Sequence, residues 1–232
     1  MANTTLRKVN IHEQAAQLAE PFTMIDLIEI DDLTLSVFLC QGSLPFHRHL
    51  DQDELFLVAS GTITVEGEWG TVLLRPGEMT VVPKGVGHRS SSLLRSLVLL
   101  LQPRLVVHRR NGDRHLFALK GRGQLAKVDL EAVGRQIAVP FQPVSVADVD
   151  TFAVHLLACE GIGPWWVYDN QSSLVLCHDG AVTLETEDDR LSLRRDDVTV
   201  VPPHVPFRLS STGRAIVLSL KRHVQPGPSP VA

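Results

Sequence analysis

Cysteine is scarce in this chain of 232 residues, and long apolar runs are missing. The three cysteines, Cys40, Cys159 and Cys177, are an odd set without CxxC spacing, which argues against a disulfide framework and predicts reduced, buried thiols. The most apolar stretch, residues 97–101, is far shorter than the roughly 20 residues that a membrane-spanning helix needs. No apolar segment follows the charges of the N-terminus, so a signal peptide is not predicted. We therefore expect a cytoplasmic protein with no membrane partner.

A dominant charge of one sign is also missing. The chain has 22 Lys and Arg against 26 Asp and Glu, a net charge of −4. This balance argues against a nucleic-acid partner held by whole-surface electrostatics. Hydrophobic residues make up 44% of the chain, which is too many for a disordered protein. Glycine-rich phosphate loops and GxSxG are absent, so nothing supports nucleotide binding or serine-hydrolase chemistry.

The sequence does contain an internal repeat. A shift of 119 residues aligns residues 11–102 with residues 130–221 without a gap, and about 29 of the 92 positions are identical. We read two tandem copies of one domain, divided as residues 1–122 and 123–232.

Each copy is predicted to be mostly β, because short apolar or alternating runs are separated by Gly, Pro, Asp and Ser. Strands at this spacing suggest a sandwich or barrel. A short amphipathic helix is expected before each copy, ended by Pro21 and by Pro140. A hairpin is expected around Asn111 and Gly112, and a disordered tail from residue 225. The expected helices are 12–19 and 130–138, and the expected strands of the first copy are 33–40, 54–60, 62–66, 71–74, 79–82 and 97–101.

Three histidines and one glutamate of the first copy form a candidate metal site. His47 and His49 are two residues apart, so a strand would place both imidazoles on one face. Glu54 follows a polar turn that lets the chain reverse, and His88 ends a second segment between turn residues. Imidazole and carboxylate suit one divalent transition metal, such as Fe, Mn, Zn, Ni, Co or Cu. Four protein ligands on an octahedral ion leave two positions for water, oxygen or substrate.

These two segments resemble the two signature motifs of the cupin superfamily. The first motif matches in its ligands and its closing glycine, and the second in its turn residues and histidine. Gly42 lies one residue closer to His47 than is usual, and Ser92 replaces a final Asn; neither position is a ligand. The resemblance implies a jelly-roll β-barrel with a metal in its mouth, and the repeat implies a bicupin of two such barrels. The matched residues are Gly42, His47, His49, Glu54 and Gly61, then Gly77, Pro83, Gly85 and His88.

The second copy has lost all four ligands. The 119-residue shift places Trp166, Tyr168, Ser173 and Phe207 where the first copy has its histidines and glutamate. The second barrel is therefore expected to bind no metal. Its aromatic residues either fill the vacated cavity by packing or line a pocket for an apolar or planar ligand.

Three functions are compatible with this ligand set. The favoured one is a metal-dependent dioxygenase acting on a small organic molecule, with Fe or Zn as the preferred metal. The alternatives are a metal-dependent isomerase, lyase or decarboxylase, and a non-catalytic module that binds or senses a small ligand. A pocket lined with Phe and Leu would favour a phenol or diketone, whereas Arg or Lys would favour a carboxylate or sugar phosphate.

Two further expectations concern supporting residues and assembly. Asp51, Gln52 and Asp53 lie between the ligands, and one of them could support the metal site from outside. Because cupin barrels commonly pair, a homodimer is expected, although two barrels in one chain can also pair with each other.

Overall fold

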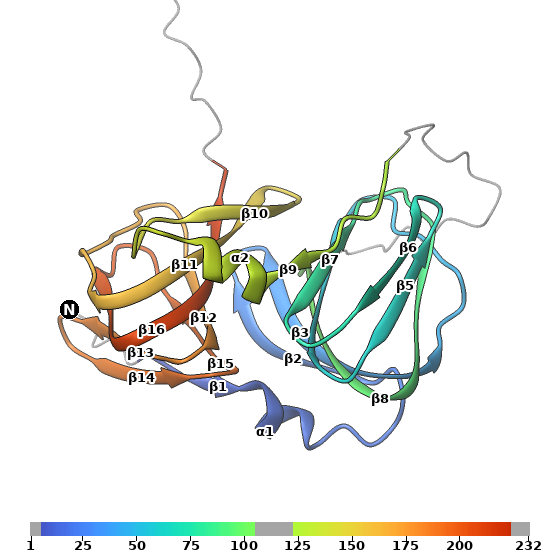
Figure 1. The fold of residues 1–232 in the computed structure, drawn as a ribbon, viewed down its shortest axis with the longest axis horizontal. Coiled ribbons are helices and arrows are strands. Elements are labelled where there is room, and N and C mark those ends of the chain that lie inside the picture. The colour runs from blue at the N-terminus through green and yellow to red at the C-terminus, as the bar shows by residue number, and fades with distance from the viewer. Residues whose placement is uncertain (1–5, 105–122, 224–232) are drawn as a thin grey trace, which may run out of the picture.

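The computed structural model describes residues 6–104 and 123–223 and contains two eight-stranded sheets that form two barrels side by side (Figure 1). The expected all-β class with short helices is confirmed. The hairpin expected around Asn111 and Gly112 and the tail from residue 225 lie outside the described residues. None of the described helices is both long and apolar enough to span a bilayer.

The first barrel is organised by two long strands, β3 and β8, which pair from Leu33 and Pro103 to Ser43 and Ser91 with one irregularity near Cys40. The N-terminal part of β8 also pairs with β5, and its C-terminal part pairs with β4, so one strand joins the two sides of the barrel. Most expected strands are confirmed, and β2 is an addition. The strands are β2 (Met24–Ile30), β3 (Leu33–Ser43), β4 (Glu54–Ser60), β5 (Ile63–Gly67), β6 (Gly70–Leu74), β7 (Glu78–Val82) and β8 (His88–Pro103).

The second barrel repeats this arrangement. The pairs β11–β16, β12–β16 and β13–β16 take the places of β3–β8, β4–β8 and β5–β8, in the register that the 119-residue shift predicts. The internal repeat is thus a repeat of structure. The strands are β10 (Val144–Val149), β11 (Phe152–Ile162), β12 (Ser173–Asp179), β13 (Ala181–Thr186), β14 (Arg190–Arg194), β15 (Asp197–Val201) and β16 (Phe207–Arg222).

Both helices are shorter than the sequence predicted. Helix α1 (Ile11–Ala15) is capped by the Asn10 side chain, and α2 (Leu130–Gln136) by that of Asp129. Each helix ends early in a tighter turn, and an arginine of the long strand (Arg95 or Arg214) donates hydrogen bonds to carbonyls there. These bonds satisfy C-terminal carbonyls that lack a helical partner.

Each barrel receives a short strand from the other copy of the repeat. Strand β1 (Val9–Asn10) pairs with β15 of the second sheet, and β9 (Val128–Asp129) pairs with β7 of the first. The two strands therefore cross the division proposed between residues 122 and 123. The exchange joins the two barrels through backbone hydrogen bonds.

The main hydrophobic cluster lies between the barrels and contains residues of both. Along β3, Val37 and Leu39 belong to this shared cluster, whereas Phe38 and Cys40 point into the first barrel. In β11, Leu156 joins the shared cluster, and Leu157 points into the second barrel. Both faces of these central strands are thus buried, so the barrels pair within one chain. The homodimer stays a prediction.

The three cysteines pack inside the barrels and are free thiols, as expected. Burial raises the pKa of Cys40 to about 11 and the pKa values of Cys159 and Cys177 to about 12. A thiol with such a pKa carries almost no thiolate at neutral pH, so these residues serve packing rather than redox chemistry.

Leu156→Ala tests the shared core. Leu156 is fully buried between the barrels, so truncation should lower the free energy of unfolding by about 2–5 kcal/mol. Urea unfolding should show both barrels melting in one transition. Leu93 is 97% exposed, and Leu93→Ala is the matched control, expected to change stability by less than about 0.5 kcal/mol. Two separate transitions, of which only one shifts, would contradict a shared core.

Candidate metal centre

Two backbone hydrogen bonds place His47 opposite His88. The His47 N–H donates to the His88 carbonyl at 2.9 Å, and the His88 N–H donates to the His47 carbonyl at 2.7 Å. This isolated β-bridge joins the segment after β3 to the first residue of β8. The two imidazole centroids are consequently 4.6 Å apart.

His49 and Glu54 complete the cluster from the same side of the barrel. Glu54 is the first residue of β4, and its Oε2 atom lies 3.2 Å from His49 Nε2 and 3.0 Å from His88 Nε2. One potential ligand atom from each of the four residues lies within 4.8 Å of all the others. Ligands at about 2.1 Å from one ion lie at most about 4.2 Å apart. The structure therefore brings all four predicted residues together, with the widest donor spacing about 0.6 Å beyond that limit.

Hydrogen bonds orient two of the imidazoles. His47 Nδ1 lies 2.9 Å from the Pro45 carbonyl oxygen, and His88 Nδ1 lies 3.1 Å from the Val86 carbonyl oxygen. Since a carbonyl oxygen only accepts, each Nδ1 must carry the proton. In the neutral ring the Nε2 lone pair then remains available to a metal ion.

The charges of the cluster favour a cation at its centre. Burial raises the pKa of Glu54, but the hydrogen bonds and positive charge of His49 and His88 outweigh this effect and lower it to about 2. Both Glu54 Oε2 and His88 Nε2 are buried, and outside the cluster itself neither atom has a hydrogen-bond partner among the described residues. A lone pair and a carboxylate oxygen this close repel each other unless a proton or a metal ion lies between them. The donor set therefore fits a divalent transition metal.

An ion pair between the buried Arg48 and the partly exposed Glu68 supports the ligand segments from behind. Arg48 lies between His47 and His49, so strand alternation points its side chain away from the imidazoles. Its guanidinium donates to Glu68 at 2.7 Å, and Glu68 accepts the Gly87 N–H at 2.9 Å. The pair thus connects the first motif to the residue before His88. Period-two alternation could have indicated Arg48, which our sequence reading did not single out.

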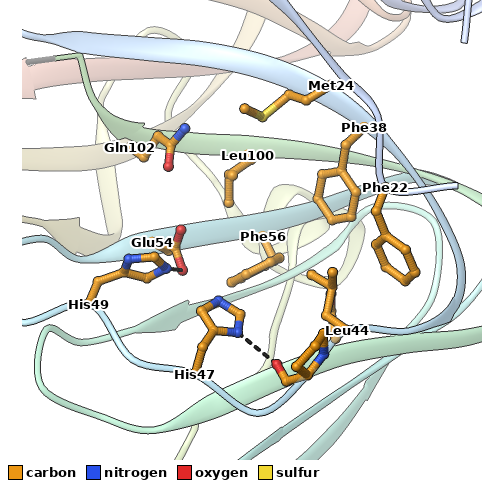
Figure 2. A pocket seen from close by; sticks show the side chains of 12 residues that line it. Phe22, Met24, Phe38, Leu44, His47, His49, Glu54, Phe56, Leu100 and Gln102 are labelled. Atoms are coloured by element: carbon orange, nitrogen blue, oxygen red, sulfur yellow. Dashed lines mark hydrogen bonds and ion pairs between the residues drawn. The ribbon is translucent and has the colours of Figure 1, made fainter. Parts of the chain in front are cut away.

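The ligand cluster opens into a cavity of about 380 Å³ with mostly apolar walls. Figure 2 shows His47, His49 and Glu54 on one side of it, with Phe22 and Phe38 on the other. Among the described residues no Arg or Lys lines the cavity. The lining is Phe22, Met24, Phe38, Leu44, Pro45, His47, His49, Glu54, Phe56, Ser90, Leu100 and Gln102.

The second barrel has the same backbone geometry at the equivalent site but lacks the metal-binding side chains. Trp166 and Phe207 form the equivalent β-bridge, with N–H to carbonyl distances of 2.8 and 2.9 Å. Their ring centroids are 5.7 Å apart, and Tyr168 lies 6.3 Å from Phe207. The cavity here has shrunk to about 90 Å³. The small cavity favours the packing interpretation of the aromatic residues over the ligand pocket. In the described part of the chain, the His and Glu cluster of the first barrel is the one group arranged for a metal ion.

Comparisons with known proteins agree with this description. Residues 36–93 match the model of the cupin domain family. The uncharacterized protein YdbB of Bacillus subtilis (strain 168) is 27% identical over 94 residues, which cover 40% of this chain and 83% of that protein. The match to the family model includes all four candidate ligands.

Solved structures resemble the whole chain. A cupin 2 conserved barrel domain protein from Leptotrichia buccalis has a TM-score of 0.69 at 9% identity, covering 93% of this chain and 96% of that one. Salicylate 1,2-dioxygenase from Pseudaminobacter salicylatoxidans has a TM-score of 0.75 at 11% identity, covering 95% and 85%. Its adduct with gentisate has a TM-score of 0.71 at 12% identity, covering 95% and 81%. Residues 36–93 thus form a cupin domain with its metal motif intact, and the chain as a whole shares the two-barrel fold of these structures.

His49→Ala tests the ligand assignment. The variant should lose most of its bound metal, because it removes one of four ligand atoms and leaves His88 as the one imidazole within 3.2 Å of Glu54 among the described residues. Metal content of the purified protein, measured by elemental analysis, checks this. Tyr168→Ala removes the residue at the equivalent position of the second barrel and should lose no metal. Unchanged metal content in His49→Ala would refute the site.

Metal occupancy should fall as the pH drops below about 6, because histidines must be neutral to bind a metal ion. Burial and the neighbouring His88 and His49 lower the pKa of His47, against the effect of its Pro45 hydrogen bond, so this ring stays neutral to lower pH than an ordinary histidine. Glu54, with a pKa of about 2, remains a carboxylate throughout. Elemental analysis after dialysis between pH 4 and 8 measures the loss. Occupancy unchanged down to pH 4 would contradict histidine ligation.

Proposed function

We propose that this protein is a metal-dependent dioxygenase that acts on a small phenol or diketone. The observation that carries the proposal is the position of the ligand cluster at one wall of an apolar, Phe-rich cavity. His47, His49, Glu54 and His88 would hold one divalent transition metal, with iron favoured. Such an ion would supply the redox and Lewis-acid chemistry that oxygen insertion requires.

The cavity residues would hold a planar substrate beside the ligands. Phe56 is buried, and its ring lies 5.9 Å from that of His88 at 73°, so its edge or face borders the cluster directly. Phe22 and Phe38 lie on the other side of the cavity and would pack on the substrate ring (Figure 2). These apolar walls exclude water and orient the substrate, which is the part of catalysis that positioning supplies.

The charge of the cavity points to a neutral substrate. Salicylate 1,2-dioxygenase, whose fold this chain shares, takes by its name a substrate with a carboxylate. The described lining here contains no cationic side chain that would pair with a carboxylate outside the metal site. A phenol or diketone, which can present oxygen atoms to the metal and apolar surface to the phenylalanines, fits this lining better.

Oxygen uptake tests the function. Protein loaded in turn with Fe(II), Mn(II), Ni(II), Co(II), Cu(II) or Zn(II) should consume oxygen with at least one member of a panel of phenols and diketones, and His49→Ala should not. Product masses should show the added oxygen atoms. Equal turnover under anaerobic conditions would overturn the proposal in favour of a metal-dependent isomerase, lyase or decarboxylase. Tight binding without turnover at every metal would leave a binding or sensing module instead.

A further inference from the structure

Asp150 of the second barrel contacts the loop between the candidate ligands His49 and Glu54, which we call the candidate metal loop. Asp150 lies in the turn between β10 and β11, and its carboxylate accepts the Asp53 N–H at 3.2 Å. In return, the Asp53 carboxylate accepts the Asp150 N–H at 2.8 Å. The two residues therefore form a reciprocal pair of hydrogen bonds across the interface between the barrels. Asp53 immediately precedes the candidate ligand Glu54.

The same pair also reaches the second motif. The other oxygen of the Asp53 carboxylate accepts the Lys84 N–H at 2.9 Å, and the Lys84 ammonium lies 3.6 Å from Asp150. The next residue, Gly85, donates its N–H to the His49 carbonyl at 2.6 Å. Asp150 is thus connected to the backbone beside His49 and Glu54 and to the turn that leads to His88.

The geometry of this contact is specific. The Asp150 side chain is 14% exposed, and two carboxylates this close repel each other unless donors separate them. Three backbone N–H groups and the Lys84 ammonium supply those donors. Asp150 also has φ of +50°, a left-handed conformation that Asp and Asn adopt more readily than most residues.

The internal repeat contains an equivalent contact, in which the first barrel meets a loop of the second barrel that carries no candidate metal ligands. Asp31 is the counterpart of Asp150, has φ of +52°, and accepts the Ser172 N–H at 3.1 Å. Ser172 is the counterpart of Asp53, and the residue after it is Ser173, where the first barrel has Glu54. Asp150 therefore contacts the candidate metal loop, whereas Asp31 contacts the equivalent loop of the second barrel, which has no candidate ligands.

We propose that Asp150 is a positioning residue for the metal centre, through which the second barrel sets the placement of Glu54 and His49. This inference rests on the proposed metal site. In this proposal the second barrel, which lacks the four metal ligands, helps to position the ligands of the first barrel. Groups that orient metal ligands from outside typically change metal affinity by about 10–100-fold when removed. Loss of the Asp150 carboxylate should weaken metal binding within that range, without removing any ligand.

The experiment compares Asp150→Gly with Asp31→Gly. Glycine adopts positive φ without strain, so each variant loses a carboxylate and keeps the turn. Affinity for Zn(II) and Co(II) is measured on the full chain by competition with a chelator, and the visible spectrum of bound Co(II) reports ligand geometry. We expect Asp150→Gly to bind at least about tenfold more weakly with an altered spectrum, and Asp31→Gly to match the wild type.

Asp150→Asn separates positioning from folding. Asn tolerates the left-handed conformation and keeps one oxygen that can accept the Asp53 N–H, so it should restore most of the affinity that Asp150→Gly loses. Thermal unfolding of the metal-free proteins should show similar losses for the two glycine variants. Equal metal affinity and spectra in Asp150→Gly and Asp31→Gly would overturn the positioning role. A wild-type protein that binds neither metal would instead refute the proposed site itself.

Discussion

The pair of backbone hydrogen bonds between His47 and His88 is the interaction on which the candidate site depends. It joins the segment after one long strand to the start of the other, so two ligands from distant parts of the chain face each other before any side chain is considered. Trp166 and Phe207 repeat the same bonds in the second barrel. The barrel backbone thus creates a mouth of fixed geometry, and the side chains at that mouth decide whether it can hold a cation.

The side chains at these equivalent positions affect stability in opposite ways in the two barrels. In the first barrel, the buried Glu54 carboxylate and the imidazole nitrogens of His49 and His88 crowd together, an arrangement that costs stability unless protons or a metal ion lie between them. In the second barrel, aromatic rings at the same positions pack against each other and reduce the cavity. The first mouth is therefore arranged for binding, and the second contributes its stability through packing.

Much of this arrangement could be predicted from the sequence, because it depends on local spacing. The ligands and most strands follow from the spacing of residues and from turn residues, and the repeat follows from the ungapped alignment at a shift of 119 residues. Strand β2 was missed since Asp26 and Glu29 are types depleted in strands, and the hydrogen bond from Ser36 to Asp26 that accommodates one of them exists only in the folded barrel. Strands β1 and β9 have two residues each, too few for a periodic pattern, and their partners lie in the other barrel.

The packing of one barrel on the other could not be predicted from the sequence either, because it too depends on contacts between residues far apart in the chain. This packing explains why the second barrel is needed. A strand such as β3, apolar on both faces, needs one cover inside its barrel and another outside it. The second barrel provides the outer cover, so it stays necessary after losing its ligands. Once the shared core brings the two barrels into register, the β10–β11 turn meets the loop before Glu54, and Asp150 contacts Asp53 across 97 residues of sequence. Packing between the barrels and support of the metal site are therefore consequences of one interface.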